Sequence, residues 1–109
     1  MSPSPDLLHA DALAVLTAWT APDPAQHGLR EQYLTHLSTT PDGMRRSSYP
    51  AHLTAGAIVL DAAGEQVLLN LHRKAGRWFH FGGHAEPGDH TLAAVAQREA
   101  VEESGIADL

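Results

Sequence analysis

The feature that most constrains this chain is a cluster of four ionisable side chains within six positions, Arg98-Glu99-Ala100-Val101-Glu102-Glu103. A helix turns about 100° per residue, so the three glutamates, at positions i, i+3 and i+4, share one helical face. Carboxylates this close together repel one another and destabilise the helix unless a positive group neutralises them. A magnesium ion, which binds through oxygen and brings substrate phosphates with it, is the natural candidate.

A solvated acidic face on a surface helix is the alternative. The apolar arc of the predicted helix consists of Leu92, Ala93, Ala96 and Ala100. On a helical wheel the acidic arc lies directly beside this apolar arc, whereas a solvated face would lie opposite it. Two glycines and a Glu-Pro-Gly-Asp turn also precede the helix, and a simple surface helix does not require them. We therefore favour a metal site at the edge of the core.

The segment from Gly83 to Ile106 resembles the Nudix box, whose pattern is G-x5-E-x7-R-E-U-x-E-E-x-G-U, where U is an aliphatic residue. Gly83 matches the opening glycine. Residues 98–106 match the closing half without a gap, with alanine at the first U position. The half of the box that binds metal is therefore intact.

The sequence departs from the Nudix pattern in the turn before the helix. The first glutamate of the pattern is Asp89 here, and eight residues rather than seven separate it from Arg98. We assign the extra residue to His90, which leaves Thr91 as the N-cap of the helix.

The resemblance implies an α/β fold with a Nudix-type mixed β-sheet sandwiched between helices. Residues 51–109 would form the N-terminal portion of this domain, including the box, and residues 1–50 a helical segment and linker. Nudix domains continue past the box with further strands and a final helix, so we expect the C-terminal part of the domain to be lacking.

Two helices are predicted in the N-terminal segment. Ser4 is expected to cap the first helix, which the apolar spacing extends to about Thr20. Asp23-Pro24 repeats the start signal for a second helix, which Gly28 is expected to break or weaken. Residues 38–50 are polar and rich in turn signals, and they form the best linker candidate. The helical pair could pack on the domain or form a dimer contact, so a homodimer is considered.

From residue 52 onward the sequence predicts strands at 52–60, 66–71 and 78–81. The first two are expected to pair as a hairpin across a turn at 61–65. Because their apolar runs are nearly continuous, we expect burial on both faces of the sheet. Residues 72–77 form a basic loop, the densest positive run in the chain.

The resemblance also implies a reaction and its site residues. The Gly82 carbonyl and the carboxylates of Glu99, Glu102 and Glu103 would bind Mg²⁺, with Mn²⁺ as an alternative. Arg98 would orient the glutamates, and its i+4 partner is Glu102. The reaction would be metal-dependent hydrolysis of a pyrophosphate bond in a nucleoside diphosphate linked to another moiety, either a nucleotide or a nucleotide sugar.

Substrate contacts are expected from the basic loop and the strand after it. Arg73 and Arg77 would hold phosphate oxygens, with Arg73 placed for bidentate contact. Trp78 could stack on a nucleobase, or it could pack on the sheet face. Three histidines near turns match no common zinc-ligand spacing and are expected to face solvent: His80, His84 and His90.

Composition limits the partners and the compartment. Seven basic and thirteen acidic residues give a net charge of −6 with neutral histidines, which argues against a nucleic-acid-binding surface because such a surface needs a basic patch. The absence of cysteine fits a reducing cytoplasm. The N-terminus lacks the basic start of a signal peptide, and no apolar window is long enough to span a membrane. We expect a cytoplasmic protein that acts on a small-molecule nucleotide.

Two other hypotheses stay open at this point. A catalytically inactive Nudix-fold module could bind or sense a nucleotide, although such a module has no reason to keep mutually repelling acids. A helical interaction protein would leave the glycine-rich segment unexplained. Metal dependence separates the hypotheses, because only an enzyme needs the ion for turnover.

Overall fold

The computed structural model describes residues 6–109. Within this range it contains three helices and six short strands. In chain order they are α1 (Leu7–Ala18), α2 (Pro24–Thr39), β1 (Ala55–Ala57), β2 (Val59–Leu60), β3 (Val67–Leu68), β4 (Asn70–His72), β5 (Arg77–Phe79), β6 (Phe81–Gly83) and α3 (Leu92–Ser104). The mixture of helices and strands agrees with the predicted α/β class.

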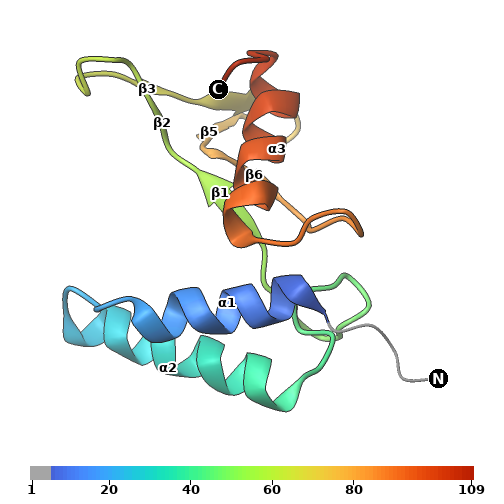
Figure 1. Ribbon diagram of the computed structural model, residues 1–109. Coiled ribbons are helices and arrows are strands. Elements are labelled where there is room, and N and C mark those ends of the chain that lie inside the picture. The colour runs from blue at the N-terminus through green and yellow to red at the C-terminus, as the bar shows by residue number, and fades with distance from the viewer. Residues whose placement is uncertain (1–5) are drawn as a thin grey trace.

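Helices α1 and α2 form an antiparallel pair that lies beneath the strands in Figure 1. Asp6 caps α1, since its carboxylate accepts a hydrogen bond from the His9 amide at 3.2 Å. Ser4, the predicted cap, lies outside the described residues. Helix α1 ends at Ala18, two residues before the predicted end. Across residues 6–109, no helix has the length and apolar character needed to cross a membrane.

Helix α2 starts at Pro24 as predicted but runs unbroken through Gly28, so the predicted break there is wrong. A glycine costs a helix only about 1 kcal/mol, and tertiary contacts override it. The Arg30 guanidinium donates to the carbonyls of Leu16 at 2.8 Å and Thr17 at 2.9 Å, which ties α2 to the last turn of α1. The predicted linker also begins too early, because α2 extends to Thr39.

The strands pair in three antiparallel ladders: β1 with β6, β2 with β3, and β4 with β5. The predicted hairpin is confirmed by the β2–β3 pairing, with Val59 opposite Leu68. The strand predicted at 52–60 is interrupted at Ile58 and forms two strands, β1 and β2. In the described part of the chain each ladder has two strands, so the single mixed sheet sandwiched between helices stays a prediction.

Gly82 and Gly83, predicted to form a turn, belong to strand β6. Gly82 lies directly opposite Gly56 of β1. A Cβ atom on Gly56 would lie 2.7 Å from the Phe81 carbonyl oxygen, and one on Gly82 would lie 3.0 Å from the Ala55 carbonyl oxygen. The glycines are therefore needed because the two strands approach too closely for side chains on these faces.

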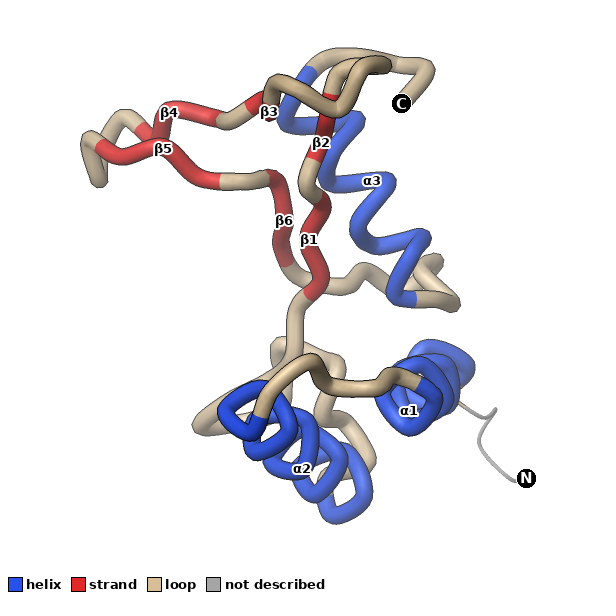
Figure 2. The backbone as a smooth tube through the Cα atoms, turned by 90° about the vertical axis from the view of Figure 1, so that its left-hand side faces the viewer, coloured by secondary structure: helices blue, strands red, loops and turns tan. Residues whose placement is uncertain are grey.

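The prediction that the strands are buried on both faces is wrong for much of the described sheet. Ile58 remains 64% exposed, and Leu60, Val67 and Leu71 are each close to half exposed or more. The reason is visible in Figure 2, where α3 runs alongside β1 and β6 while the β4–β5 hairpin extends away from it. Burial is therefore concentrated where α3 covers the β1–β6 ladder.

The main core joins the two halves of the chain. Its buried members are Leu8, Ala12, Leu37, Met44, Ala85 and Val95. They come from α1, α2, the 40–50 segment, the loop before α3, and α3 itself. On α3 the buried residues are Val95 and Ala100. Ala100 belongs to the predicted apolar arc, whereas Ala93, also placed in it, is exposed. The boundary at residue 50 stays a prediction, and the core crosses it.

Candidate functional site

Helix α3 carries the four ionisable residues of the site, and its two ends are set by local sequence. The Thr91 hydroxyl accepts a hydrogen bond from the Ala94 amide at 3.0 Å, which confirms Thr91 as the N-cap. Gly105 ends the helix in a left-handed conformation with φ of 75°, and its amide donates to the Val101 carbonyl. The glycine near the end of the box is therefore a C-cap, where a residue without Cβ is favoured.

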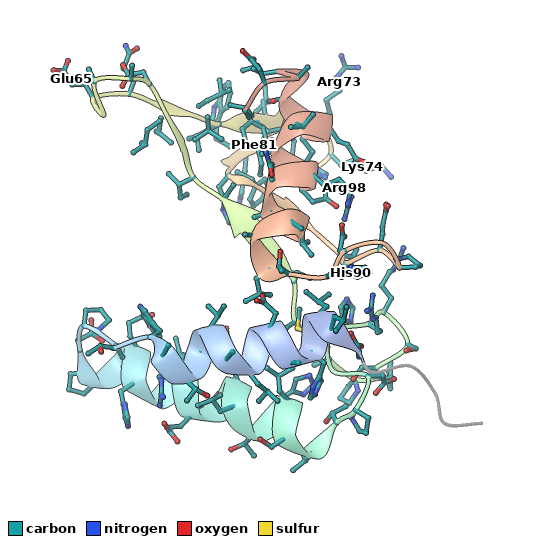
Figure 3. All side chains as sticks on the ribbon, in the orientation of Figure 1. Glu65, Arg73, Lys74, Phe81, His90 and Arg98 are labelled. Carbon is teal, nitrogen blue, oxygen red and sulfur yellow. The ribbon has the colours of Figure 1, made fainter. Side chains whose placement is uncertain are left out.

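Arg98 lies among carboxylates on the side of α3 that faces the loop 84–91 (Figure 3). Its Nη1 atom donates to Glu99 at 3.1 Å and to Glu102 at 3.2 Å. Its Nη2 atom donates to the His84 carbonyl at 3.0 Å. The predicted i+4 contact with Glu102 is confirmed, and Arg98 holds two of the three glutamates at once.

Asp89 is the strongest partner of Arg98. One Asp89 oxygen lies 2.8 Å from Arg98 Nη2, and both oxygens accept from Nε at 3.2 Å. The same carboxylate accepts from the Glu86 amide at 2.9 Å, and the Asp89 amide donates back to the Glu86 carbonyl, which confirms the predicted turn. Asp89, although displaced by one position from the Nudix pattern, therefore anchors the arginine.

This anchoring shifts the protonation equilibria of both groups. Hydrogen bonds from Arg98 hold the pKa of Asp89 below its ordinary value; burial opposes this shift, and the Glu86 amide reinforces it. The pKa of Arg98 is raised above its ordinary value, chiefly by Asp89. Asp89 is 6% exposed. The pair is therefore a charged, largely buried bridge between the turn and the helix.

The three glutamates point to different surroundings. Glu99 is mostly buried, and its carboxylate lies against β6, where a Cβ atom on Gly83 would come within 2.6 Å of Oε1. Glu102 is more than half exposed and contacts Arg98. Glu103 accepts a hydrogen bond from the Asn70 side chain of β4 at 3.4 Å. Gly83 therefore matters in this structure because the Glu99 carboxylate packs on its backbone.

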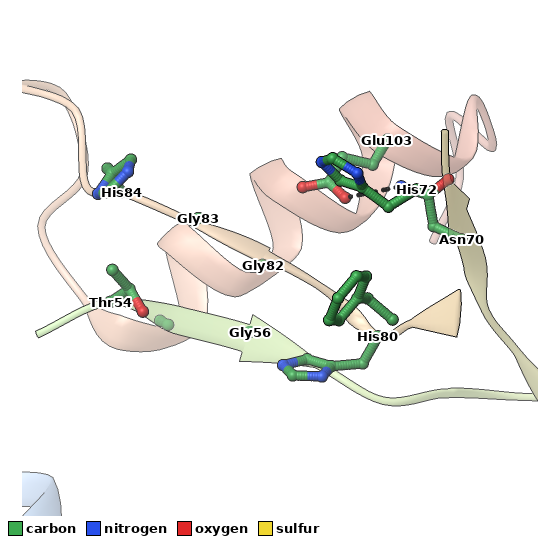
Figure 4. A pocket seen from close by; sticks show the side chains of 11 residues that line it. Thr54, Gly56, Asn70, His72, His80, Gly82, Gly83, His84 and Glu103 are labelled. Carbon is green, nitrogen blue, oxygen red and sulfur yellow. Dashed lines mark hydrogen bonds between the residues drawn. The ribbon is translucent and has the colours of Figure 1, made fainter. Parts of the chain in front are cut away.

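A cavity of about 650 Å³ opens between α3 and the strands (Figure 4). Gly82 and Gly83 of β6 and Glu103 of α3 line it. Gly82 and Glu103 are predicted metal ligands, and Gly83 is the opening glycine of the box. Further side chains that line it, which the sequence did not predict, are Thr54, Asn70, His72 and Phe79. The alternation of side chains along β4 and β5 indicates part of this set, because Asn70 and Phe79 lie opposite each other and so share one face of the ladder.

The predicted substrate contacts lie apart from this cavity. Trp78 is 63% exposed, and it precedes the cavity-lining Phe79, so the strand alternation directs it to the other face. Arg73 lies in the β4–β5 connection, and Arg77 begins β5. Neither arginine is among the residues that line the cavity. Their roles and that of Trp78 stay predictions.

Histidines surround the cavity more closely than the sequence suggested. His80, His84 and His90 are all exposed, as expected, and His80 and His84 also line the cavity. His84 also contacts His52 across the chain, with 2.7 Å between Nδ1 and Nε2. The spacing of these residues in the sequence conceals this contact, because 32 positions separate the two rings.

The donor atoms near β6 are of the kind that Mg²⁺ prefers. Glu99 packs against the Gly83 backbone, and Glu103 lines the same cavity as Gly82 and Gly83, so carboxylate and carbonyl oxygens are both present. In the present side-chain orientations, no three histidine, aspartate or glutamate residues in the range 6–109 form a metal-binding group. Glu99 and Glu102 are instead bound to Arg98. The donor set suits a hard cation, and rotation of side chains would be needed to close around it.

These features define an α/β protein whose acidic helix borders a cavity lined by strand backbone. Residues 50–109 match the family model of the NUDIX domain, which is more than half of the chain. The chain belongs to the Nudix family, and its fold is therefore of the pyrophosphohydrolase type. Searches of curated proteins and of solved structures found no match.

Proposed function

We propose that this protein hydrolyses a pyrophosphate bond in a nucleoside diphosphate linked to another moiety, with Mg²⁺ or Mn²⁺ as its cofactor. The observation that carries the proposal is the meeting of Glu103 and the β6 glycines at one cavity, while Glu99, held by Arg98, packs against one of these glycines, Gly83. The Nudix match supports the same reaction class.

The metal would be held by the Gly82 carbonyl and by Glu99, Glu102 and Glu103. When bound, the ion polarises a phosphorus–oxygen bond and lowers the pKa of a coordinated water. The protein's own contribution is to hold the acids in place. Arg98 neutralises part of their charge while its fork fixes Glu99 and Glu102, and so acts as a positioning residue.

The size of the cavity favours a small-molecule nucleotide, because ligand sites of about 300–1,000 Å³ enclose molecules of this size. Phe79 offers an aromatic surface inside it. Arg73 and Arg77, from the β4–β5 hairpin, would hold phosphate oxygens of a substrate that extends beyond the cavity. Stacking of Trp78 on a base would require the substrate to reach the other face of β5. The net charge of −6 disfavours a nucleic-acid substrate.

The test is release of phosphate or nucleotide from a panel of nucleoside diphosphate derivatives, with and without Mg²⁺. Glu103→Gln removes one charged metal ligand and should lower turnover by about 100-fold, equivalent to about 3 kcal/mol of metal-assisted stabilisation. Glu65→Gln is the matched control, since Glu65 lies exposed in the turn between β2 and β3. It should keep full activity.

A binding or sensor module is the second candidate, and the engagement of Glu99 and Glu102 by Arg98 favours it, since both acids are already neutralised. In that case the folded protein would bind members of the panel but turn none of them over. Binding without turnover at saturating Mg²⁺ would replace the enzymatic proposal with this one.

A further inference from the structure

The first turn of α3 receives a capping contact from helix α1. The Asp11 carboxylate of α1 accepts a hydrogen bond from the Leu92 amide at 2.8 Å, although 81 positions separate the two residues. Leu92 is the first residue of α3, and Thr91 already satisfies the Ala94 amide. Amides at a helix N-terminus lack partners within the helix and carry a partial positive charge, so a carboxylate there is doubly favourable.

Two further contacts join α1 to the same region. Leu8 and Ala12 of α1 are buried in one core with Ala85 and Val95, which lie before and within α3. The Arg45 side chain connects the N-cap of α1 to the loop before α3. Its guanidinium donates to the Asp6 carboxylate at 2.9 Å and to the Glu86 carbonyl at 3.3 Å. Figures 1 and 2 both show the N-terminal end of α3 lying over α1.

We propose that Asp11 is a positioning residue for the box helix, and that the metal affinity of the site depends on this contact from the N-terminal helices. The proposal rests on the function proposed above. A helix transmits displacement along its axis, and Arg98 lies only about 9 Å from Leu92 by the helical rise. The Glu99 carboxylate already packs tightly against Gly83, so a small shift of α3 relative to β6 changes the spacing of the acidic and backbone ligands.

The experiment compares Asp11→Ala with Asp23→Ala in the full chain. Asp23 is a matched control because its carboxylate also accepts from a helix N-terminal amide at 2.8 Å, that of Gln26, but it belongs to α2. Three quantities are measured: Mn²⁺ affinity by calorimetry, hydrogen exchange of the Leu92 amide, and the NMR signal of Arg98 Nε–H. Asp11→Ala should weaken Mn²⁺ binding about tenfold, as outer contacts of metal sites do.

Asp11→Ala should also accelerate exchange at Leu92 and shift the Arg98 signal, while Asp23→Ala leaves all three readouts unchanged. Asp11→Asn retains an acceptor oxygen and should restore most of the Mn²⁺ affinity. If Asp11→Ala does not fold, the same three quantities are measured on Asp11→Asn. An unaltered Arg98 signal or an unaltered Mn²⁺ affinity in folded Asp11→Ala overturns the proposal, as does an equal change in Asp23→Ala. If the unsubstituted protein binds no Mn²⁺, the proposed function fails, and the Leu92 and Arg98 readouts alone decide whether Asp11 positions the helix.

Discussion

Loss of the Asp89 carboxylate should be the most costly single change in the site. Asp89 is 6% exposed and bonds both Arg98 and the Glu86 amide. Removing one partner of a buried ion pair costs about 3–5 kcal/mol, because a buried charge is left uncompensated. The Arg98 side chain is 21% exposed and keeps Glu99 and Glu102 as partners, so we expect Asp89→Ala to lower the free energy of unfolding by about 2–3 kcal/mol.

Urea denaturation of the unsubstituted protein and two variants measures this cost. Asp6→Ala is the matched control, because Asp6 makes the same paired contact with Arg45 and also accepts from a backbone amide. Both side chains of that pair are 27% exposed, so solvent screening should limit its loss to about 1 kcal/mol. Similar denaturant slopes would show that the change lies in stability and not in the unfolded state.

The order of the two losses tests whether burial strengthens the Asp89–Arg98 bridge. If Asp89→Ala costs no more than Asp6→Ala, burial does not strengthen the Asp89–Arg98 bridge as argued. The same variant should also reduce turnover in the Mg²⁺ assay, since Arg98 would lose the anchor that orients it. A destabilised variant with unchanged turnover would mean that Asp89 serves stability alone.

Two further predictions follow from the same residues. Gly83→Ala should weaken Mg²⁺-dependent activity because the new Cβ would lie 2.6 Å from the Glu99 carboxylate. Gly88→Ala is the control and should leave activity intact, because nothing lies within 4 Å of its new Cβ. Equal activities of the two variants would contradict the prediction. The pKa of Asp89 is lowered from 3.8 on folding, so its stabilising contribution is complete above about pH 4 and is lost as the pH falls through the lower folded value. The difference in free energy of unfolding between the unsubstituted protein and Asp89→Ala, measured by urea denaturation followed by circular dichroism, should therefore be constant above about pH 4 and shrink at lower pH. An identical pH dependence in both proteins would refute the linkage.

Much of the box could be predicted because its signals are local. The Thr91 cap, the pairing of Arg98 with Glu102 and the turn before Asp89 all join residues within about four positions. Helix caps and i+4 pairs depend on the chain's own neighbours, so the sequence carries them without reference to the rest of the molecule. The same holds for the β2–β3 hairpin, whose turn contains Gly64 with φ of 70°.

The errors came from contacts that no local pattern encodes. Gly28 was expected to break or weaken α2, but the helix is continuous through it and packs against α1. Gly82 and Gly83 were expected in a turn, because a glycine pair indicates flexibility but does not reveal that Gly82 pairs with a residue 26 positions away. Only the pairing of Gly82 with Gly56 shows that the glycines serve the close approach of two backbones.

The sequence by itself therefore determined the acidic helix, its ends and its membership of the Nudix family. The tertiary structure decided which residues surround that helix: Asp11 at its first amide, Asp89 on Arg98, and the strand side chains around the cavity. The physical reason is the range of the interactions. Capping and helical pairing act within a turn or two of the chain, whereas packing and long-range hydrogen bonds depend on where the folded chain brings distant residues together.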